Sequence, residues 1–228
     1  MTTATGPVVL LAGGPGTRRD VYRPLLRELL AGAGKARPRV AYLGAATDDD
    51  PRFTGLMERL VRSAGDCAFA LAPVAGRRAA RGAARAVLED ADLVLLGGGD
   101  VELGMRRLAE RDLSEPLARK HAAGTPLLGV SAGAILLCRR WIRWRDPDDD
   151  GSAEPFDCLA LAPILCDCHG EADGWAELRA LLRLAGEGAL GHGLRAGAAL
   201  RLTTGGRADV VCGTVDRLAL RRGAVVAL

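Results

Sequence analysis

The sequence is poor in the residue types that mark several functional classes. Only two of its 31 basic residues are lysines, and arginines and acids are interleaved to a net charge of +3, so no concentrated basic surface for nucleic acid is predicted. No apolar run approaches the eighteen or so residues of a membrane span, and the first residues show neither a basic region nor a cleavage site. We therefore expect a cytoplasmic protein that binds neither nucleic acid nor membrane.

The six cysteines are too few for a disulfide framework in 228 residues. Cys67, Cys138 and Cys212 lie in apolar segments and are expected to be reduced core residues. The run Cys166-Asp167-Cys168-His169 has metal-ligand residue types, but it lacks the paired C-x-x-C spacing of structural zinc sites. We expect neither a metal nor an organic cofactor.

Short apolar runs alternate along the chain with segments of helical periodicity. Strands are expected at residues 8–12, 39–43, 67–71, 93–96 and 126–130, with amphipathic helices between them. This alternation predicts a parallel, doubly wound α/β sheet whose sites lie at the carboxyl ends of the strands. Short strands after residue 198 are expected to complete the sheet edge, and the length suits one domain, residues 1–228.

The segment Gly129-Val130-Ser131-Ala132-Gly133 follows the last of these apolar runs. A serine flanked by glycines at this point indicates a nucleophile elbow, in which a buried strand turns sharply into a helix and exposes the hydroxyl. The alternative is an ordinary strand-to-helix turn rich in small residues. Because the chain contains only four serines, a chance match to this pattern is disfavoured.

A serine hydroxyl needs a base, and the usual base is a neutral imidazole. His121 lies on the helix before the elbow strand, on the side of the sheet away from Ser131. His169 follows an apolar stretch at an expected strand end. His192 lies between Gly191 and Gly193 before a late strand, and is expected either near the site or only in a turn. We favour His169 over His192 as the base, although a single histidine is often a structural residue.

An acid should orient the imidazole, and an acidic run at residues 146–150 lies between the serine and the histidine. Asp146 is nearest the tryptophan-rich segment and is the predicted member. For the oxyanion, one predicted donor is the amide of Ala132 at the start of the elbow helix. The other is an amide of the triple-glycine turn at residues 97–99.

These residues together resemble the family of serine peptidases that includes the aspartyl dipeptidases (dipeptidase E) and the cyanophycinases. The resemblance rests on the elbow around Ser131, on the Leu96-Gly97-Gly98-Gly99-Asp100 turn and on a histidine about forty residues after the serine. It implies a three-layer, glutamine-amidotransferase-like α/β fold. It also implies roles for individual residues: Ser131 as nucleophile, His169 as base, Asp146 as orienting acid, and Gly99 with Ala132 as the oxyanion hole.

The function implied by the resemblance is hydrolysis of short peptides by a serine exopeptidase, with dipeptides bearing an N-terminal aspartate as candidate substrates. One alternative is a cyanophycinase-like hydrolase of β-aspartyl-arginine polymer, and another is a non-catalytic binding module on the same fold. The chain differs from the family at Arg195 and Ala196, where relatives commonly have an acidic residue. The expected partner is a small peptide, and the sequence leaves a homodimer open.

Overall fold

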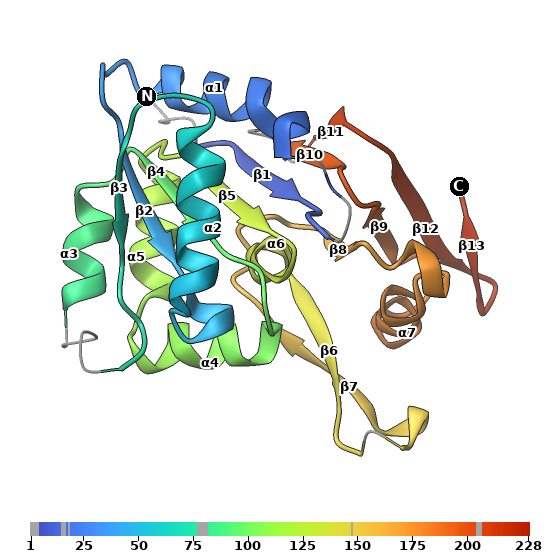
Figure 1. Ribbon diagram of the computed structural model, residues 1–228. Helices are drawn as coiled ribbons and strands as arrows, with labels where there is room; N and C mark the ends of the chain where they lie inside the picture. Colours follow the sequence, from blue (N-terminus) through green and yellow to red (C-terminus); the bar gives the residue numbers. More distant parts are fainter. Residues whose placement is uncertain (1–4, 15–16, 18, 77–81, 147, 204–206) are drawn as a thin grey trace.

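A seven-stranded sheet forms the centre of the molecule (Figure 1). The computed structural model describes residues 5–228 except 15–16, 18, 77–81, 147 and 204–206. The strand order is β11-β10-β1-β5-β4-β2-β3, and the five strands from β1 to β3 in that order run parallel. The strands are β1 (Val8–Leu11), β2 (Arg39–Leu43), β3 (Ala68–Leu71), β4 (Leu93–Leu96), β5 (Leu127–Val130), β10 (Ala199–Leu202) and β11 (Ala208–Cys212).

Helices cover both faces of this sheet, as Figure 1 shows. Alternate residues of β1 pack on opposite faces: Val9 joins the core under one pair of helices, and Leu10 joins the core under the others. The first pair is α1 (Arg23–Gly32) and α2 (Pro51–Arg62); the others are α3 (Ala83–Glu89), α4 (Val101–Glu110), α5 (Ser114–Ala122) and α6 (Ala132–Leu137). The predicted doubly wound, three-layer α/β fold is thereby confirmed.

A second, four-stranded sheet of order β13-β12-β9-β8 lies beside the first and packs against helix α7 (Ala176–Ala185). Its strands are β8 (Leu165–Cys168), β9 (Leu190–Leu194), β12 (Val215–Arg221) and β13 (Ala224–Ala227). The expectation that the late strands extend the main sheet is correct for β10 and β11 but wrong for β12 and β13. Apolar alternation identifies a strand without specifying its partner, and β12 pairs with β9 instead.

Strands β6 (Arg140–Trp144) and β7 (Ala153–Asp157) form a hairpin that projects from the body of the molecule (Figure 1). Four short 3-10 helices complete the described structure: η1 (Arg19–Tyr22), η2 (Ala45–Thr47), η3 (Asp150–Ser152) and η4 (Glu171–Asp173). One of the helices expected between the strands, that between residues 71 and 93, is α3, which begins at Ala83; residues 77–81 lie outside the described part of the chain. Among the described helices, none has the length and apolar character needed to cross a bilayer.

Candidate active site

Ser131 lies between β5 and α6 with a backbone conformation that is rare for a residue with a side chain. Its φ is 53° and its ψ is −119°, and its amide donates a hydrogen bond of 2.8 Å to the carbonyl oxygen of Leu11 on β1. This bond and the flanking elements hold the residue in its strained state. The hydroxyl therefore stands at the carboxyl edge of the parallel sheet, as a nucleophile elbow requires.

The two glycines that flank Ser131 are required by close backbone contacts. A methyl group on Gly133 would lie 2.2 Å from the carbonyl oxygen of Leu96, and one on Gly129 would lie 2.4 Å from the carbonyl oxygen of Gly133. Atoms cannot approach this closely, so any side chain would push α6 off the sheet. The first turn of α6 consequently lies directly against the ends of β4 and β5.

His169 follows β8 and brings its imidazole to the serine. Ser131 Oγ lies 2.7 Å from His169 Nε2, so a neutral imidazole with its proton on Nδ1 accepts a hydrogen bond from the hydroxyl. The His169 amide donates to the carbonyl oxygen of Leu194 at 2.8 Å, and its backbone has a positive φ of 51°. The strand end thus places the ring beside Ser131, although the two residues are 38 positions apart.

The other two histidines lie elsewhere. His192 is a β9 residue with only 7% of its surface exposed, and burial lowers its pKa. It borders a separate cavity whose lining includes Arg139 and Ile164. The carbonyl of His121 accepts a hydrogen bond from the amide of Gly6, which precedes β1, so His121 lies at the amino end of the strands, away from Ser131.

The structure does not bring Asp146 together with His169. Asp146 lies in the turn of the β6–β7 hairpin, where its carboxylate accepts a 3.0 Å hydrogen bond from the amide of Asp148 and its own amide donates to Ser152 Oγ. Among the described residues, no carboxylate forms a hydrogen bond or ion pair with His169. The site therefore contains a Ser–His pair, without the third member expected from the sequence.

Two acids near His169, Asp216 on β12 and Glu171 in η4, have other partners. The carboxylate of Asp216 forms a two-point ion pair with Arg195, at 2.9 and 3.0 Å, and this pair holds the pKa of Asp216 below its usual range. The carboxylate of Glu171 accepts a 3.1 Å hydrogen bond from the amide of Ala196. Arg195 and Ala196, where the family resemblance implies an acid, are thus engaged in structural contacts.

The glycine turn after β4 lies opposite the serine. A methyl group on Gly98 would lie 3.2 Å from Ser131 Cβ and 3.7 Å from its Oγ, so Gly98 keeps the space beside the hydroxyl open. Gly99, with a φ of 138°, packs against the carbonyl oxygen of Ala46. Ala132 is the first residue of α6, where a backbone amide has no partner within the helix.

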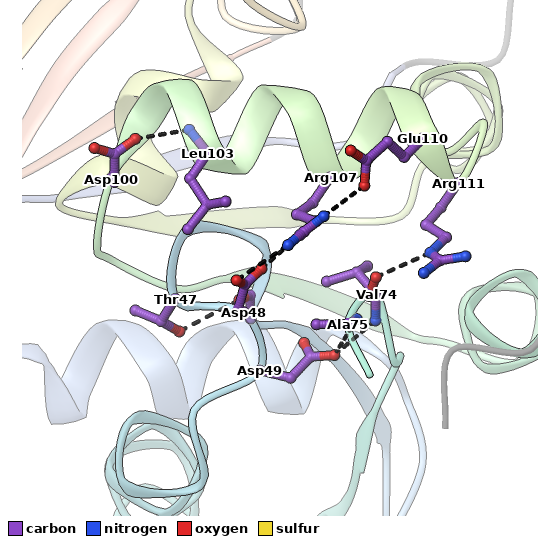
Figure 2. Close-up of polar contacts among 11 residues, drawn as sticks. Thr47, Asp48, Asp49, Val74, Ala75, Asp100, Leu103, Arg107, Glu110 and Arg111 are labelled. Atoms are coloured by element: carbon purple, nitrogen blue, oxygen red, sulfur yellow. Dashed lines mark hydrogen bonds and ion pairs between the residues drawn. The ribbon is translucent and has the colours of Figure 1, made fainter. Parts of the chain in front are cut away.

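A polar network behind this turn fixes its position (Figure 2). The amide of Asp100 donates to the carbonyl oxygen of Ala46 at 2.8 Å, which joins the turn to the loop between β2 and α2. That loop is held by Asp48, which pairs with Arg107 of α4 at 2.5 and 3.1 Å. Asp49 Oδ2 accepts from the amides of Val74 and Ala75 at 2.7 and 2.8 Å.

A cavity of about 470 Å³ opens beside Ser131, large enough for a small ligand. No cluster of three potential metal ligands occurs among the described residues. The described cysteines are free thiols, and the pKa values of the fully buried Cys166 and Cys168 are raised. The pKa of Cys166 is raised by its contact with Cys138 and by burial, and that of Cys168 by its contact with Cys166 and by burial.

Several residues of the site are not evident from sequence patterns. In the sequence, Gly98 is one of three consecutive glycines. Which of the three faces Ser131 depends on the dihedral angles of the turn. The pairing of Asp48 with Arg107 joins residues 59 positions apart, which no local pattern reveals. One feature of the sequence indicates that α2 lines the cavity. Its apolar stripe extends to Phe53, one turn beyond the residues that a buried helix face needs.

The chain matches one family model over most of its length and matches individual proteins over shorter segments. The model of peptidase family S51 matches residues 8–209. Peptidase E of Salmonella gallinarum (strain 287/91 / NCTC 13346) is 34% identical over 86 residues, which are 37% of this chain and 36% of that relative. The chain thus spans about a third of that relative's length. Pyridoxal 5'-phosphate synthase subunit PdxT of Geobacillus kaustophilus (strain HTA426) is 44% identical over 61 residues, 26% of this chain and 31% of that protein.

The fold is similar to that of a solved peptidase. The crystal structure of a peptidase from an acI-B1 Actinobacterium superimposes with a TM-score of 0.74, covering 100% of this chain and 96% of the other. Sequence identity over this superposition is 18%, so the likeness concerns the fold. It supports the glutamine-amidotransferase-like architecture expected from the sequence.

Proposed function

The chain belongs to peptidase family S51, and we propose that it is a serine peptidase acting on short peptides, with Ser131 as nucleophile and His169 as general base. The observation that supports this most directly is the 2.7 Å separation between Ser131 Oγ and His169 Nε2. This distance lies within the range that proton transfer to a general base requires. The exposed position of the pair at the edge of the sheet leaves it accessible to a substrate.

In the proposed reaction, Ser131 Oγ attacks the carbonyl carbon of the scissile bond while His169 Nε2 takes the hydroxyl proton. The new C–O bond yields a tetrahedral oxyanion, and backbone amides of Ala132 and of Gly98 or Gly99 are the proposed donors to it, since the Gly97 amide already donates to the carbonyl oxygen of Leu43. His169 then protonates the leaving amine as the C–N bond breaks. Water, deprotonated by the same imidazole, hydrolyses the acyl-enzyme and regenerates Ser131.

The proposal does not include Asp146 in the catalytic group. A histidine without an orienting carboxylate still accepts the serine proton, but the imidazolium that forms is stabilised less. The backbone hydrogen bond from His169 to Leu194 supplies part of the orientation that an acid would give. We therefore expect a working hydrolase whose rate falls below that of a complete triad.

The resemblance to aspartyl dipeptidases and cyanophycinases directs the first assays to two substrates. These are dipeptides with an N-terminal aspartate and the β-aspartyl-arginine polymer. Both carry charged groups, whereas His169 is the only titratable group other than a tyrosine among the described residues that line the cavity beside Ser131. The proposed reaction is accordingly acyl transfer from short peptides.

A fluorophosphonate probe tests the proposal directly, because it reacts with an activated serine and not with an ordinary one. We expect covalent labelling of Ser131, detected by mass spectrometry of the modified peptide, and loss of peptide hydrolysis by about a thousandfold or more in Ser131→Ala. Ser152→Ala, in the β6–β7 hairpin, is the matched control. A folded protein whose Ser131 is never labelled would instead be the non-catalytic binding module.

A further inference from the structure

The cavity beside Ser131 has an apolar wall that the proposed chemistry does not use. Helix α2 contributes Phe53, Leu56, Met57 and Leu60, and the opposite side includes Tyr22 and Val130. The four α2 residues are spaced i, i+3, i+4 and i+7, so they form one stripe along the helix. This stripe runs from the buried core to the opening of the cavity.

Burial along the stripe shows why it is more than the usual core face of a helix. Met57 and Leu60 are 5% and 4% exposed and pack under the sheet with α1. Phe53 is 41% exposed at the first turn of α2, where no core packing accounts for a large apolar side chain. A phenylalanine at the opening of a cavity next to a nucleophile offers a binding surface for an apolar group.

The charge of the lining is equally informative. No described lysine, arginine, aspartate or glutamate borders the cavity, and burial raises the pKa of Tyr22, so its hydroxyl stays neutral. Among the described lining residues, a carboxylate that entered would find no cation to offset its loss of water, which costs several kcal/mol. An apolar side chain would bury its surface at no such cost.

We propose that this cavity is the subsite for the residue whose carbonyl is transferred to Ser131, and that it selects an uncharged apolar side chain, such as that of leucine or phenylalanine, over aspartate. The inference rests on the proposed function, since it assigns a substrate class to the same serine. The acyl residue is the one attached to Oγ in the intermediate. The glycine turn that borders Oγ also borders the cavity.

The test is a comparison of aminoacyl p-nitroanilides that differ only in the acyl residue, assayed with the full chain. We expect kcat/KM for the leucyl and phenylalanyl substrates to exceed that for the aspartyl substrate by about 100-fold, the discrimination expected when a buried site must desolvate an unpaired charge. A preference for the aspartyl substrate, or equal rates for all three, would overturn the proposal.

Variants of Phe53 test whether this cavity is the source of the preference for apolar acyl residues. Phe53→Ala should lower kcat/KM for the phenylalanyl substrate by about 10-fold, because one contact surface is removed. Phe53→Arg should lower the ratio of phenylalanyl to aspartyl activity further, because it places a cation at the opening. Leu184→Ala on α7, where Leu184 is 45% exposed, is the matched control and should leave the ratio unchanged. An unchanged ratio in both Phe53 variants would refute the assigned subsite.

Labelling of Ser131 separates failure of this inference from failure of the proposed function. If a fluorophosphonate modifies Ser131 but the aspartyl substrate is preferred, the nucleophile is correct and the apolar subsite is wrong. If Ser131 remains unmodified and no aminoacyl substrate is hydrolysed, both are wrong. Circular dichroism of each variant shows whether a lost activity reflects lost folding.

Discussion

Ser131 and His169 share a feature that distinguishes them from most of the chain: both have side chains and positive φ angles, of 53° and 51°. Each such conformation costs roughly 1–3 kcal/mol and persists only where surrounding structure enforces it. Here the enforcing contacts are backbone hydrogen bonds to Leu11 and Leu194, on two different strands. The hydroxyl–imidazole pair is therefore held by the sheets rather than by flexible loops.

The position of Asp146 leads to a prediction that separates the structure from the sequence pattern. Asp146→Asn should leave kcat/KM within about twofold of wild type, because an exposed hairpin turn has no contact with His169. Steady-state kinetics on any cleaved substrate measures this. A triad acid replaced by its amide loses about ten-thousandfold in kcat, so a loss approaching that size would return Asp146 to the catalytic group.

Asp167 is a buried acid, and its titration couples folding to pH. Burial, with the nearby Glu177 and Asp173 carboxylates, raises the pKa of Asp167 to about 7, whereas an unfolded aspartate titrates near 3.9. Between these values the folded chain retains a proton that the unfolded chain has released. The stabilisation by neutral Asp167 is therefore complete below about pH 4 and is lost as the pH rises to about 7.

Asp167→Asn removes this dependence, because the amide stays neutral and can still accept the 2.7 Å hydrogen bond from the amide of Cys168. The difference in the free energy of unfolding, variant minus wild type, should increase by on the order of 3 kcal/mol from pH 4 to pH 8. Urea denaturation at the two pH values measures the gain. Asp146→Asn serves as the control, and an identical pH dependence in wild type and Asp167→Asn would contradict the assignment.

Helix α4 and the loop between β2 and α2 act together as a brace for the glycine turn. Arg107 of α4 pairs with Asp48 of the loop. The carbonyl oxygen of Ala46 in the same loop accepts a hydrogen bond from the amide of Asp100, the residue that follows the three glycines. Because exposed ion pairs contribute about 0–1 kcal/mol, the pairing of Arg107 with Asp48 adds little to global stability. Its proposed role is to hold the glycine turn in position beside Ser131.

Arg107→Ala tests this brace. We expect kcat to fall about 10-fold with little change in KM, because a displaced turn weakens oxyanion stabilisation, and loss of one donor outright costs about 100-fold or more. Arg107→Lys should recover only part of the rate, because lysine lacks the two-point geometry. Arg119→Ala on α5, which removes exposed ion pairs far from the turn, is the control. Equal effects of Arg107→Ala and Arg119→Ala on kcat would remove the assigned role.

The seven-stranded and four-stranded sheets share one buried hydrophobic cluster. Leu10 of β1 and Val94 of β4 belong to the same buried cluster as Leu181 of α7 and Leu218 of β12. A core that crosses the boundary between the sheets couples their unfolding. We therefore expect residues 1–228 to behave as one domain.

A single unfolding transition is the expected consequence. The three tryptophans lie in β6 and immediately before α7, so their fluorescence reports the region outside the seven-stranded sheet, whereas far-ultraviolet circular dichroism reports all elements. Both signals should change at the same urea concentration. Leu178→Ala, at a fully buried position of α7, should lower the free energy of unfolding by about 2–5 kcal/mol and shift both signals together. Separate transitions would indicate two units.

The local features of this protein followed from its sequence. Strand and helix periodicity reflects backbone geometry, which is satisfied within a short segment, so the alternating α/β pattern and the elbow around Ser131 were predictable. His169 was also expected at a strand end, but β8 belongs to the four-stranded sheet, so the packing of the two sheets brings its imidazole to Ser131. The family resemblance, confirmed by the match over residues 8–209, agreed with this local reading.

Other features were decided only by contacts between distant segments. Asp146 lies between the serine and the histidine in the chain, yet the register of β6 with β7, which pairs Trp144 with Ala153, carries it into the hairpin turn. Gly98 faces Ser131 because of the dihedral angles of its turn, and Phe53 reaches the cavity because α2 crosses that face of the sheet. Such placements depend on the tertiary packing of many residues, and no short stretch of sequence contains that information.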